Sequence, residues 1–232
     1  MPGPLQFAIW FLGTLLEVAV VVCAFKKNLF RRYFFLNLYM LLSAAVSAGR
    51  FHVLMTDGFD STAYRYFYFY SDALLTITLF FALISLFSYV FQEMHVEKYV
   101  RMGAVLLLGG TAWFTYAVVN QSSARIVTHF VFELSQNLYF VGLVLTYVLW
   151  GAILKLRETR ALLVQLVLSL GVYFSAYAAS YAISNLRPNL FNYVSLLVPV
   201  IGCLLPLAWS YAFWRVPDDC RLAPARLTVV PR

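Results

Sequence analysis

Seven long apolar segments follow one another along this chain and occupy nearly all of its 232 residues. They cover residues 5–25, 33–55, 66–91, 100–119, 126–153, 161–184 and 190–214. A helix needs about 20 mostly apolar residues to cross a bilayer, and each segment reaches that length. In lipid, only helices and closed barrels satisfy all of their backbone hydrogen bonds. The sequence therefore predicts an all-α membrane protein with seven transmembrane helices.

The composition supports this assignment, because 62% of the residues are hydrophobic and only 12% are charged. A soluble domain has about 25% charged residues. The segments leave no room for a soluble domain, so we expect a single transmembrane domain over residues 1–214 and a short tail over residues 215–232.

The basic residues are concentrated in every second connection between the segments. Thirteen of the 17 lysine and arginine residues lie there or in the tail: Lys26, Lys27, Arg31, Arg32, Lys98, Arg101, Lys155, Arg157, Arg160, Arg215, Arg221, Arg226 and Arg232. The positive-inside rule places these connections in the cytoplasm. We therefore expect the N-terminus outside and the C-terminus in the cytoplasm. Because the basic loops are short and adjoin lipid, the net charge of +7 does not indicate nucleic-acid binding.

The stretch HFVFELSQN, residues 129–137, places a histidine, a glutamate, a glutamine and an asparagine inside an apolar segment. Ionisable groups in a spanning helix cost about 2.5–3.5 kcal/mol each on insertion scales, so they face the bundle interior and seek partners. His129 and Glu133 are four residues apart and share one helix face. Asn137 extends that face by a turn. This segment is expected to form one wall of a polar region.

Other segments are expected to contribute polar groups at a similar depth. Arg50 and Asp72 should lie a turn or two below the outer boundary by the helical rise per residue, which allows an ion pair between them. Tyr173 and Tyr177 belong to a polar stripe on the sixth segment. These groups predict an outward-facing polar cavity or a buried network. Three interpretations stay open: a purely structural network, a ligand or ion site, and a redox or metal site.

Glu17 stands apart near the middle of the first segment. A hydrogen bond to Asn37 or Ser43 is one interpretation of this residue, and proton coupling is the alternative. A retinal pigment is excluded, because all four lysines lie in cytoplasmic turns and no spanning segment offers one for a Schiff base.

Metal chemistry has few candidate ligands in this sequence. His52, His129 and Glu133 are the candidates for a metal, and His52 with His129 could ligate haem from two sides. No further motif supports either cofactor, so the sequence identifies none. The same holds for catalysis, since no nucleophile–base pair is apparent.

The segment LLEVAVVVCAFKKNLFRRYFFLNLYMLLSAA, followed by YFYFYSDALL, resembles a family of seven-helix integral membrane proteins of bacteria of the acidobacterial type. The resemblance covers the first three segments and implies a multi-pass protein of the bacterial inner membrane with no settled activity. The chain is also loosely similar to the seven-helix sensory regions that precede histidine kinases, and we expect it to lack the output domain of those proteins.

These observations predict a non-enzymatic membrane binding module with an outward-facing polar cavity. It would be a sensor-like receptor that acts through a protein partner, or an accessory subunit of a larger membrane complex. Its expected partners are the lipid bilayer, another protein and a small-molecule ligand. The alternatives are a small-solute or proton-coupled transporter and an intramembrane metal or haem subunit.

Overall fold

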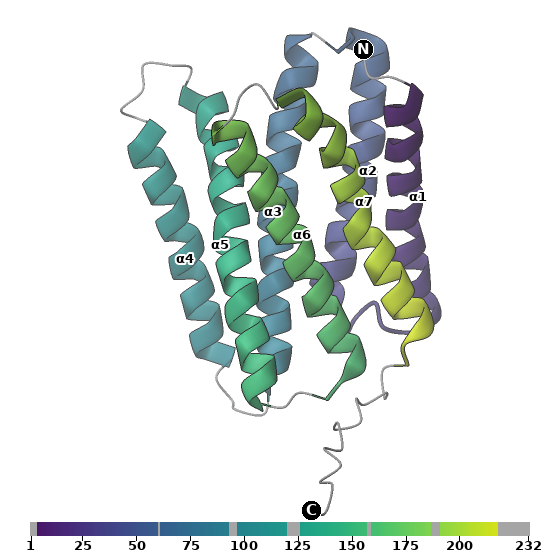
Figure 1. Ribbon diagram of the computed structural model, residues 1–232, viewed down its shortest axis with the longest axis vertical. Helices are drawn as coiled ribbons and strands as arrows, with labels where there is room; N and C mark the ends of the chain where they lie inside the picture. Colours follow the sequence, from purple (N-terminus) through teal and green to yellow (C-terminus); the bar gives the residue numbers. More distant parts are fainter. Residues whose placement is uncertain are drawn as a thin grey trace, which may run out of the picture.

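The computed structural model of the chain is a bundle of long helices (Figure 1). It describes residues 4–59, 61–92, 97–119, 126–156, 159–186 and 191–217; some side chains inside the helices, that of His129 among them, also lie outside the description. The described residues form seven α-helices and no strand. The helices are α1 (Pro4–Lys26), α2 (Phe34–Asp57), α3 (Thr62–Val90), α4 (Glu97–Val119), α5 (Ile126–Leu156), α6 (Ala161–Leu186) and α7 (Phe191–Arg215).

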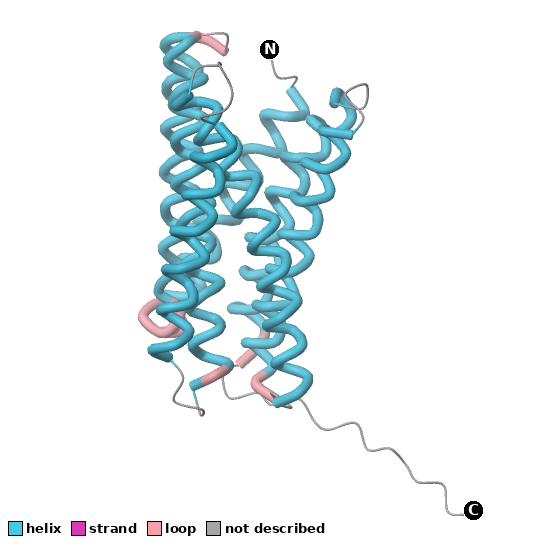
Figure 2. The backbone as a smooth tube through the Cα atoms, turned by 90° about the vertical axis from the view of Figure 1, so that its left-hand side faces the viewer, coloured by secondary structure: helices cyan, strands magenta, loops and turns pink. Residues whose placement is uncertain are grey.

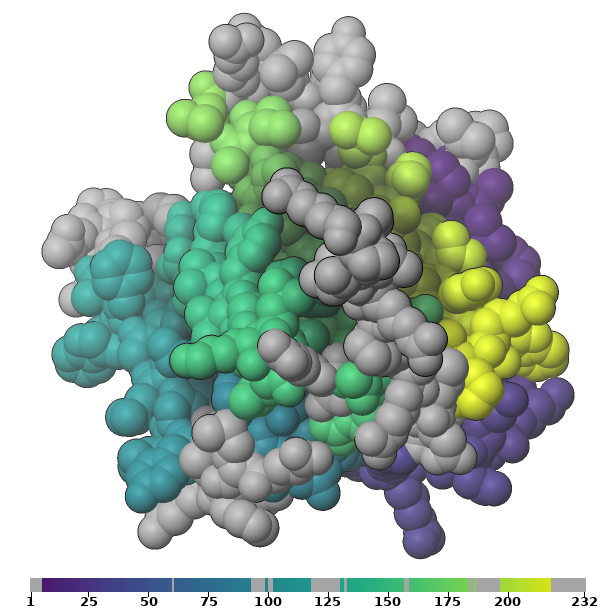
Figure 3. Space-filling model, turned by 60° about the horizontal axis from the view of Figure 1, so that its bottom comes forward, coloured from purple at the N-terminus to yellow at the C-terminus, as the bar shows by residue number. Residues whose placement is uncertain are grey.

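Six of the helices form a ring, and the seventh packs outside it. Around the ring, α1 contacts α2, α2 contacts α3, α3 contacts α5, α5 contacts α6, α6 contacts α7, and α7 returns to α1. The remaining helix, α4, packs against α5 and α3 (Figures 1 and 2). The space-filling view shows α4 on one side of the molecule and the end of α7 beside α1 on the other (Figure 3). The first and last helices therefore close the ring.

The helix bounds agree with the seven predicted segments to within a few residues at each end. By length and apolar composition, six of the described helices are able to cross a membrane: α1, α2, α3, α5, α6 and α7. In α4 the described apolar stretch is shorter and covers Met102–Ala117. An all-helical, multi-pass membrane protein is thus confirmed, with six candidate spans in the described residues.

The alternating direction of the helices brings the basic connections to one end of the bundle. Lys26 ends α1, Lys155 lies in the last turn of α5 and Arg215 ends α7. All three helices end at the lower end in Figure 1. We call this the basic end. The opposite end is formed by the end of α2 and the beginning of α3, and Arg50 and Asp72 lie on its side of the bundle.

Large side chains fill the interior of the ring. Trp209, Phe213 and Phe174 are fully buried, and the ring of Tyr33 contacts that of Phe213 at 5.8 Å between centroids. Close helix approach is required at Gly142 of α5, where a Cβ atom would overlap the ring of Phe174 on α6. The short distance between α5 and α6 at this point therefore depends on a glycine, Gly142, facing the aromatic ring of Phe174.

Candidate functional site

A carboxyl group on α1 lies inside the bundle beside α2. The Ser43 hydroxyl donates a hydrogen bond of 2.5 Å to Oε1 of Glu17, so the predicted bond to Ser43 is confirmed. The alternative partner, Asn37, instead donates to the carbonyl of Tyr33 on its own helix, at 2.9 Å. The second oxygen of Glu17, Oε2, is buried and accepts no hydrogen bond from the described residues. Oε1 of Glu17 thus connects α1 with α2, whereas Oε2 has no hydrogen-bond partner among the described residues.

Arg50 lies two turns further along α2 and reaches across to α3. Its Nε and Nη2 donate to the Ser71 hydroxyl at 3.0 and 2.8 Å, and Nη2 also donates to the Tyr68 carbonyl at 3.2 Å. The guanidinium carbon stands 4.2 Å from the centre of the Tyr68 ring, in a cation–π contact. The hydrogen bonds of Arg50 therefore go to Ser71 and Tyr68, and the direct Arg50–Asp72 bond expected from the sequence is replaced by a longer-range charge interaction.

Asp72 turns towards α5 because consecutive residues on a helix point about 100° apart. Ser71 faces Arg50, whereas the Asp72 carboxyl interacts with the Ser135 side chain. Ser135 is buried, and its Oγ makes no hydrogen bond of standard length and angle in the described structure. This looser contact connects α3 with α5 and places the Asp72 carboxyl between the two helices.

A cluster of tyrosines continues the polar region across the ring. The hydroxyl oxygens of Tyr39 on α2 and Tyr173 on α6 are 3.3 Å apart, and both side chains are buried. The Tyr173 ring contacts the Tyr177 ring at 4.7 Å, and Tyr177 stacks on Tyr139 of α5 at 4.8 Å and 5° between planes. Tyr181 also belongs to the cluster, and the centre of its ring lies 5.7 Å from the centre of the Tyr139 ring. Tyrosine is suited to this position because an apolar ring carries a single polar atom.

These groups form one electrostatically connected region. Glu17 interacts with Arg50, Asp72 interacts with Arg50, and Tyr39 interacts with all three. Tyr177 also interacts with Asp72. We call the set the polar interior; its members are Glu17, Tyr39, Ser43, Arg50, Ser71, Asp72, Ser135, Tyr139, Tyr173, Tyr177 and Tyr181. Of the predicted site residues, it contains Arg50, Asp72, Tyr173, Tyr177 and Glu17.

The remaining predicted residues fall elsewhere or outside the description. Asn137 donates a hydrogen bond of 3.1 Å to Thr115 and thereby attaches α4 to α5, away from the polar interior. Glu133 is half-buried and has interacting neighbours of its own. His52 is exposed near the end of α2. The side chain of His129 lies outside the described residues, so its predicted role stays a prediction.

The candidate metal ligands show no gathered arrangement in the part of the chain that the structure describes. No group of three or more His, Cys, Asp or Glu side chains in the described part is arranged to hold a metal ion. The predicted haem between His52 and His129 involves a side chain, that of His129, which lies outside the described residues. The metal and haem interpretations therefore gain no geometric support from the described residues.

Sequence reasoning missed several members of the polar interior. Tyr39 was detectable, because Tyr39, Ser43 and Arg50 lie on one face of α2 by helical spacing. Ser71 and Ser135 gave no such signal. Most serine and threonine hydroxyls in these helices, such as those of Thr146 and Ser175, donate to carbonyls one turn back in their own helix. A hydroxyl that bonds between helices is not distinguishable from these by sequence.

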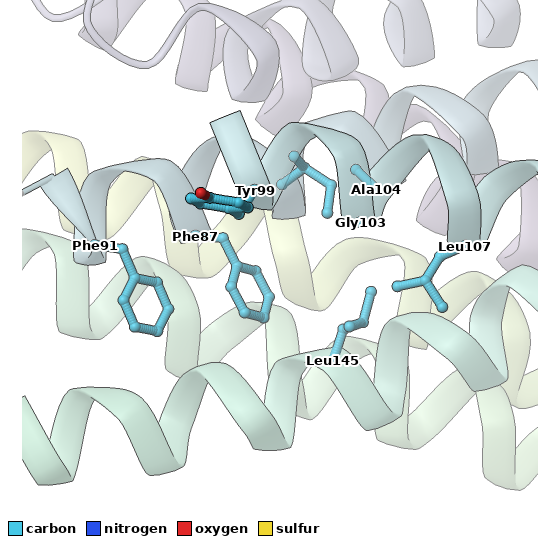
Figure 4. A pocket seen from close by; sticks show the side chains of 8 residues that line it. Phe87, Phe91, Tyr99, Gly103, Ala104, Leu107 and Leu145 are labelled. Atoms are coloured by element: carbon cyan, nitrogen blue, oxygen red, sulfur yellow. The ribbon is translucent and has the colours of Figure 1, made fainter. Parts of the chain in front are cut away.

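Two of the grooves on the surface of the bundle lie beside α5, and neither is lined by a predicted site residue. One, of about 320 Å³, lies among α3, α4 and α5 and is lined by apolar and aromatic side chains (Figure 4). The other, of about 510 Å³, lies between α5 and α6. Its Thr146 and Ser175 hydroxyls are already bonded to backbone carbonyls. The predicted outward-facing polar cavity coincides with neither groove, so the polar interior is the candidate site.

Chemically, the polar interior offers an acceptor and a donor of opposite charge that are not fully used. Glu17 Oε2 has no hydrogen-bond partner among the described residues. The hydrogen bonds of Arg50 within the described structure use Nε and Nη2, not Nη1.

Comparison of the chain with models of protein families, with curated proteins and with solved structures finds no match.

Proposed function

We propose that this protein is a non-enzymatic membrane binding module that holds a small polar ligand in the polar interior. The observation that carries the proposal is Glu17 Oε2, a buried acceptor without a partner among the described residues. A buried polar atom left unsatisfied costs about 1–3 kcal/mol. A ligand that donates a hydrogen bond to this oxygen would recover that free energy.

The charge pattern supports a particular class of ligand. Arg50 interacts electrostatically with Glu17 and still has Nη1 unused by the described residues. A molecule with a cationic donor and an anionic acceptor, such as a small zwitterion, complements both groups at once. Arg50 is held in place by Ser71 and by the Tyr68 ring, so its remaining donor is already oriented. Such preorganisation lowers the entropic cost of binding.

The arrangement of helices supports a sensor-like receptor or an accessory subunit. Through polar side chains, α2 contacts three other helices: α1 by Ser43, α3 by Arg50 and α6 by Tyr39. A ligand bound at Glu17 and Arg50 would change the balance of these contacts, and thus the relative positions of the helices. A protein partner in the membrane would read that change.

The test is the melting temperature of the purified protein in detergent, measured with millimolar amino acids, primary amines and carboxylates. A ligand at 100 times its Kd stabilises the folded state by about 2.7 kcal/mol. For a chain of this size that corresponds to a rise of about 5–11 °C. We expect a zwitterion to give the largest rise, and Glu17→Gln to abolish it.

The matched control is Asp57→Asn, which makes the same carboxylate-to-amide change at an exposed position at the end of α2. This variant should respond to the ligand as the unmodified protein does. A rise that survives Glu17→Gln, or a panel with no response at any concentration, would remove the polar interior as a ligand site.

A proton-coupled transporter is the second candidate, and the tyrosine cluster favours it. The hydroxyls of Tyr39 and Tyr173 adjoin each other, and Tyr177 lies beside them near Asp72. Such a row of hydroxyls could relay a proton to Glu17. In proteoliposomes containing a pH-sensitive dye, the ligand found by melting should then acidify the lumen with the intact protein and not with Glu17→Gln. Binding without any lumenal pH change would favour the receptor.

The proposal includes a topology: the bacterial inner membrane, seven spans with α4 as the fourth, the N-terminus outside and the basic end in the cytoplasm. The positive-inside rule and the resemblance of the first three segments support it. A cysteine at Asp57 should react with a membrane-impermeant maleimide on intact cells, while a cysteine at Arg31 should react only after lysis. Reversed labelling would overturn the orientation.

A further inference from the structure

The groove among α3, α4 and α5 is separate from the polar interior and has its own chemistry. Its walls are the side chains of Ile84, Phe87, Phe91, Tyr99, Leu107 and Leu145, with Gly103 and Ala104 between them. Figure 4 shows these side chains facing a common space from three helices. The space beside Gly103 is open, since a Cβ atom there would meet nothing within 4 Å.

The groove has the length of an acyl chain in one leaflet. Tyr99 and Leu107 mark its two ends on α4, and eight residues of helix span about 12 Å. One leaflet contributes about half of a hydrocarbon core of about 30 Å. The groove begins where α3 ends at Phe91 and α4 begins, which is the basic end of the bundle. It therefore runs from the boundary of one leaflet towards the middle of the membrane.

Two basic residues among those described, Arg160 and Lys155, lie at the end of the bundle where the groove begins. Arg160 donates a hydrogen bond of 2.8 Å to the carbonyl of Tyr89, in the last turn of α3 between Phe87 and Phe91. Lys155 lies in the last turn of α5, at the same end of the bundle. A cationic residue near the membrane surface attracts an anionic lipid by about 1 kcal/mol. The other connections at this end add further basic residues.

We propose that this groove binds an anionic phospholipid of the leaflet at the basic end. One acyl chain lies along α4 against Phe87 and Leu145, and the headgroup lies at the end of α3 near Arg160. Among the described residues that line the groove, the polar group is the Tyr99 hydroxyl, which suits the boundary between chain and headgroup. This lipid would fill the space between α4 and the ring, where α4 has its weaker contact with α3.

The test compares two variants of α4 that differ only in position. Gly103→Leu places an isobutyl group in the groove, whereas Gly109→Leu makes the same change at another open position on α4 that does not line the groove. Both proteins are purified in a mild detergent with phosphatidylglycerol or phosphatidylcholine of identical acyl chains. Bound lipid is then counted by native mass spectrometry.

We expect phosphatidylglycerol to stay bound to the unmodified protein and to the Gly109→Leu variant. In the Gly103→Leu variant its retention should fall about tenfold, which is equivalent to about 1.4 kcal/mol of binding free energy. Equal retention in both variants, or equal retention of the two lipids, would overturn the proposal. If Gly103→Leu does not give a monodisperse protein, Leu107→Trp fills the other end of the groove from an exposed position and should have the same effect.

Discussion

The bond between Ser43 and Glu17 gives a prediction whose size follows from the structure. Ser43 supplies the single hydrogen bond that the Glu17 carboxyl accepts from the described residues. Ser43→Ala would leave both carboxyl oxygens unsatisfied, at a cost of about 1–3 kcal/mol. At about 2–4 °C per kcal/mol, the melting temperature in detergent should fall by about 2–12 °C.

The opposite substitution should behave differently. Glu17→Met keeps an unbranched side chain of similar length and removes both oxygens, including the unpartnered Oε2. Ser43 would then be free to donate to the Tyr39 carbonyl one turn back, as other hydroxyls in these helices do. The melting temperature of Glu17→Met should therefore equal or exceed that of the unmodified protein when no ligand is present.

A double-mutant cycle separates this reasoning from a simple loss of packing. In the Glu17→Met background, Ser43→Ala should lower the stability of the folded protein by no more than about 0.5 kcal/mol, because that variant has no carboxyl group that could lose a hydrogen bond. The coupling between the two sites should therefore be about 0.5–3 kcal/mol. If Ser43→Ala lowers the melting temperature equally in both backgrounds, the hydrogen bond is not the source of the effect.

Two further predictions concern how the helices are held. Gly142→Ala should destabilise the bundle by about 1–3 kcal/mol, because the methyl group would overlap the buried Phe174 ring. The control is Gly151→Ala on the same helix, which has open space around it and should be neutral or stabilising by up to about 1 kcal/mol. The melting temperatures of the two variants are compared. Asn137→Leu removes the bond to Thr115, worth about 0.6 kcal/mol between membrane helices, so α4 should exchange its amide hydrogens faster while the ring helices do not. Equal exchange in all helices would contradict this.

The fold was readable from sequence because lipid imposes one strong condition on every span. Each segment must be a helix long enough to cross the membrane, so length and hydropathy suffice to place its ends. The weakest candidate for a span is α4, because its described apolar stretch, Met102–Ala117, is shorter than the six candidate spans. Which helices are neighbours was less accessible, since hydropathy does not distinguish a lipid-facing leucine from one that faces another helix.

The candidate site was readable only in part. The rarity of charge in a span identified Glu17, Arg50 and Asp72, because each needs a partner inside the bundle. Sequence reasoning named Ser43 as one of two candidate partners of Glu17, but depth alone could not assign the partner of Arg50. Ser71 and Asp72 are adjacent in sequence and equally deep, and only the rotation of α3 decides that Ser71 faces Arg50. The same rotation sends Asp72 towards Ser135.

The distribution of polar contacts indicates which part of the bundle is able to respond to a ligand. In lipid, apolar side chains give little net preference for one helix neighbour over another, so close packing and polar contacts decide the arrangement. The interhelical hydrogen bonds of Ser43, Arg50 and Tyr39 all start from α2 and reach three different helices. On the opposite side, α5 and α6 are fixed by the tight approach of Gly142 to Phe174. A ligand that competes for Glu17 and Arg50 therefore acts on the helix held mainly by replaceable bonds. Under the proposed function, a movement of α2 against the closely packed α5–α6 pair would be the response that a partner protein detects.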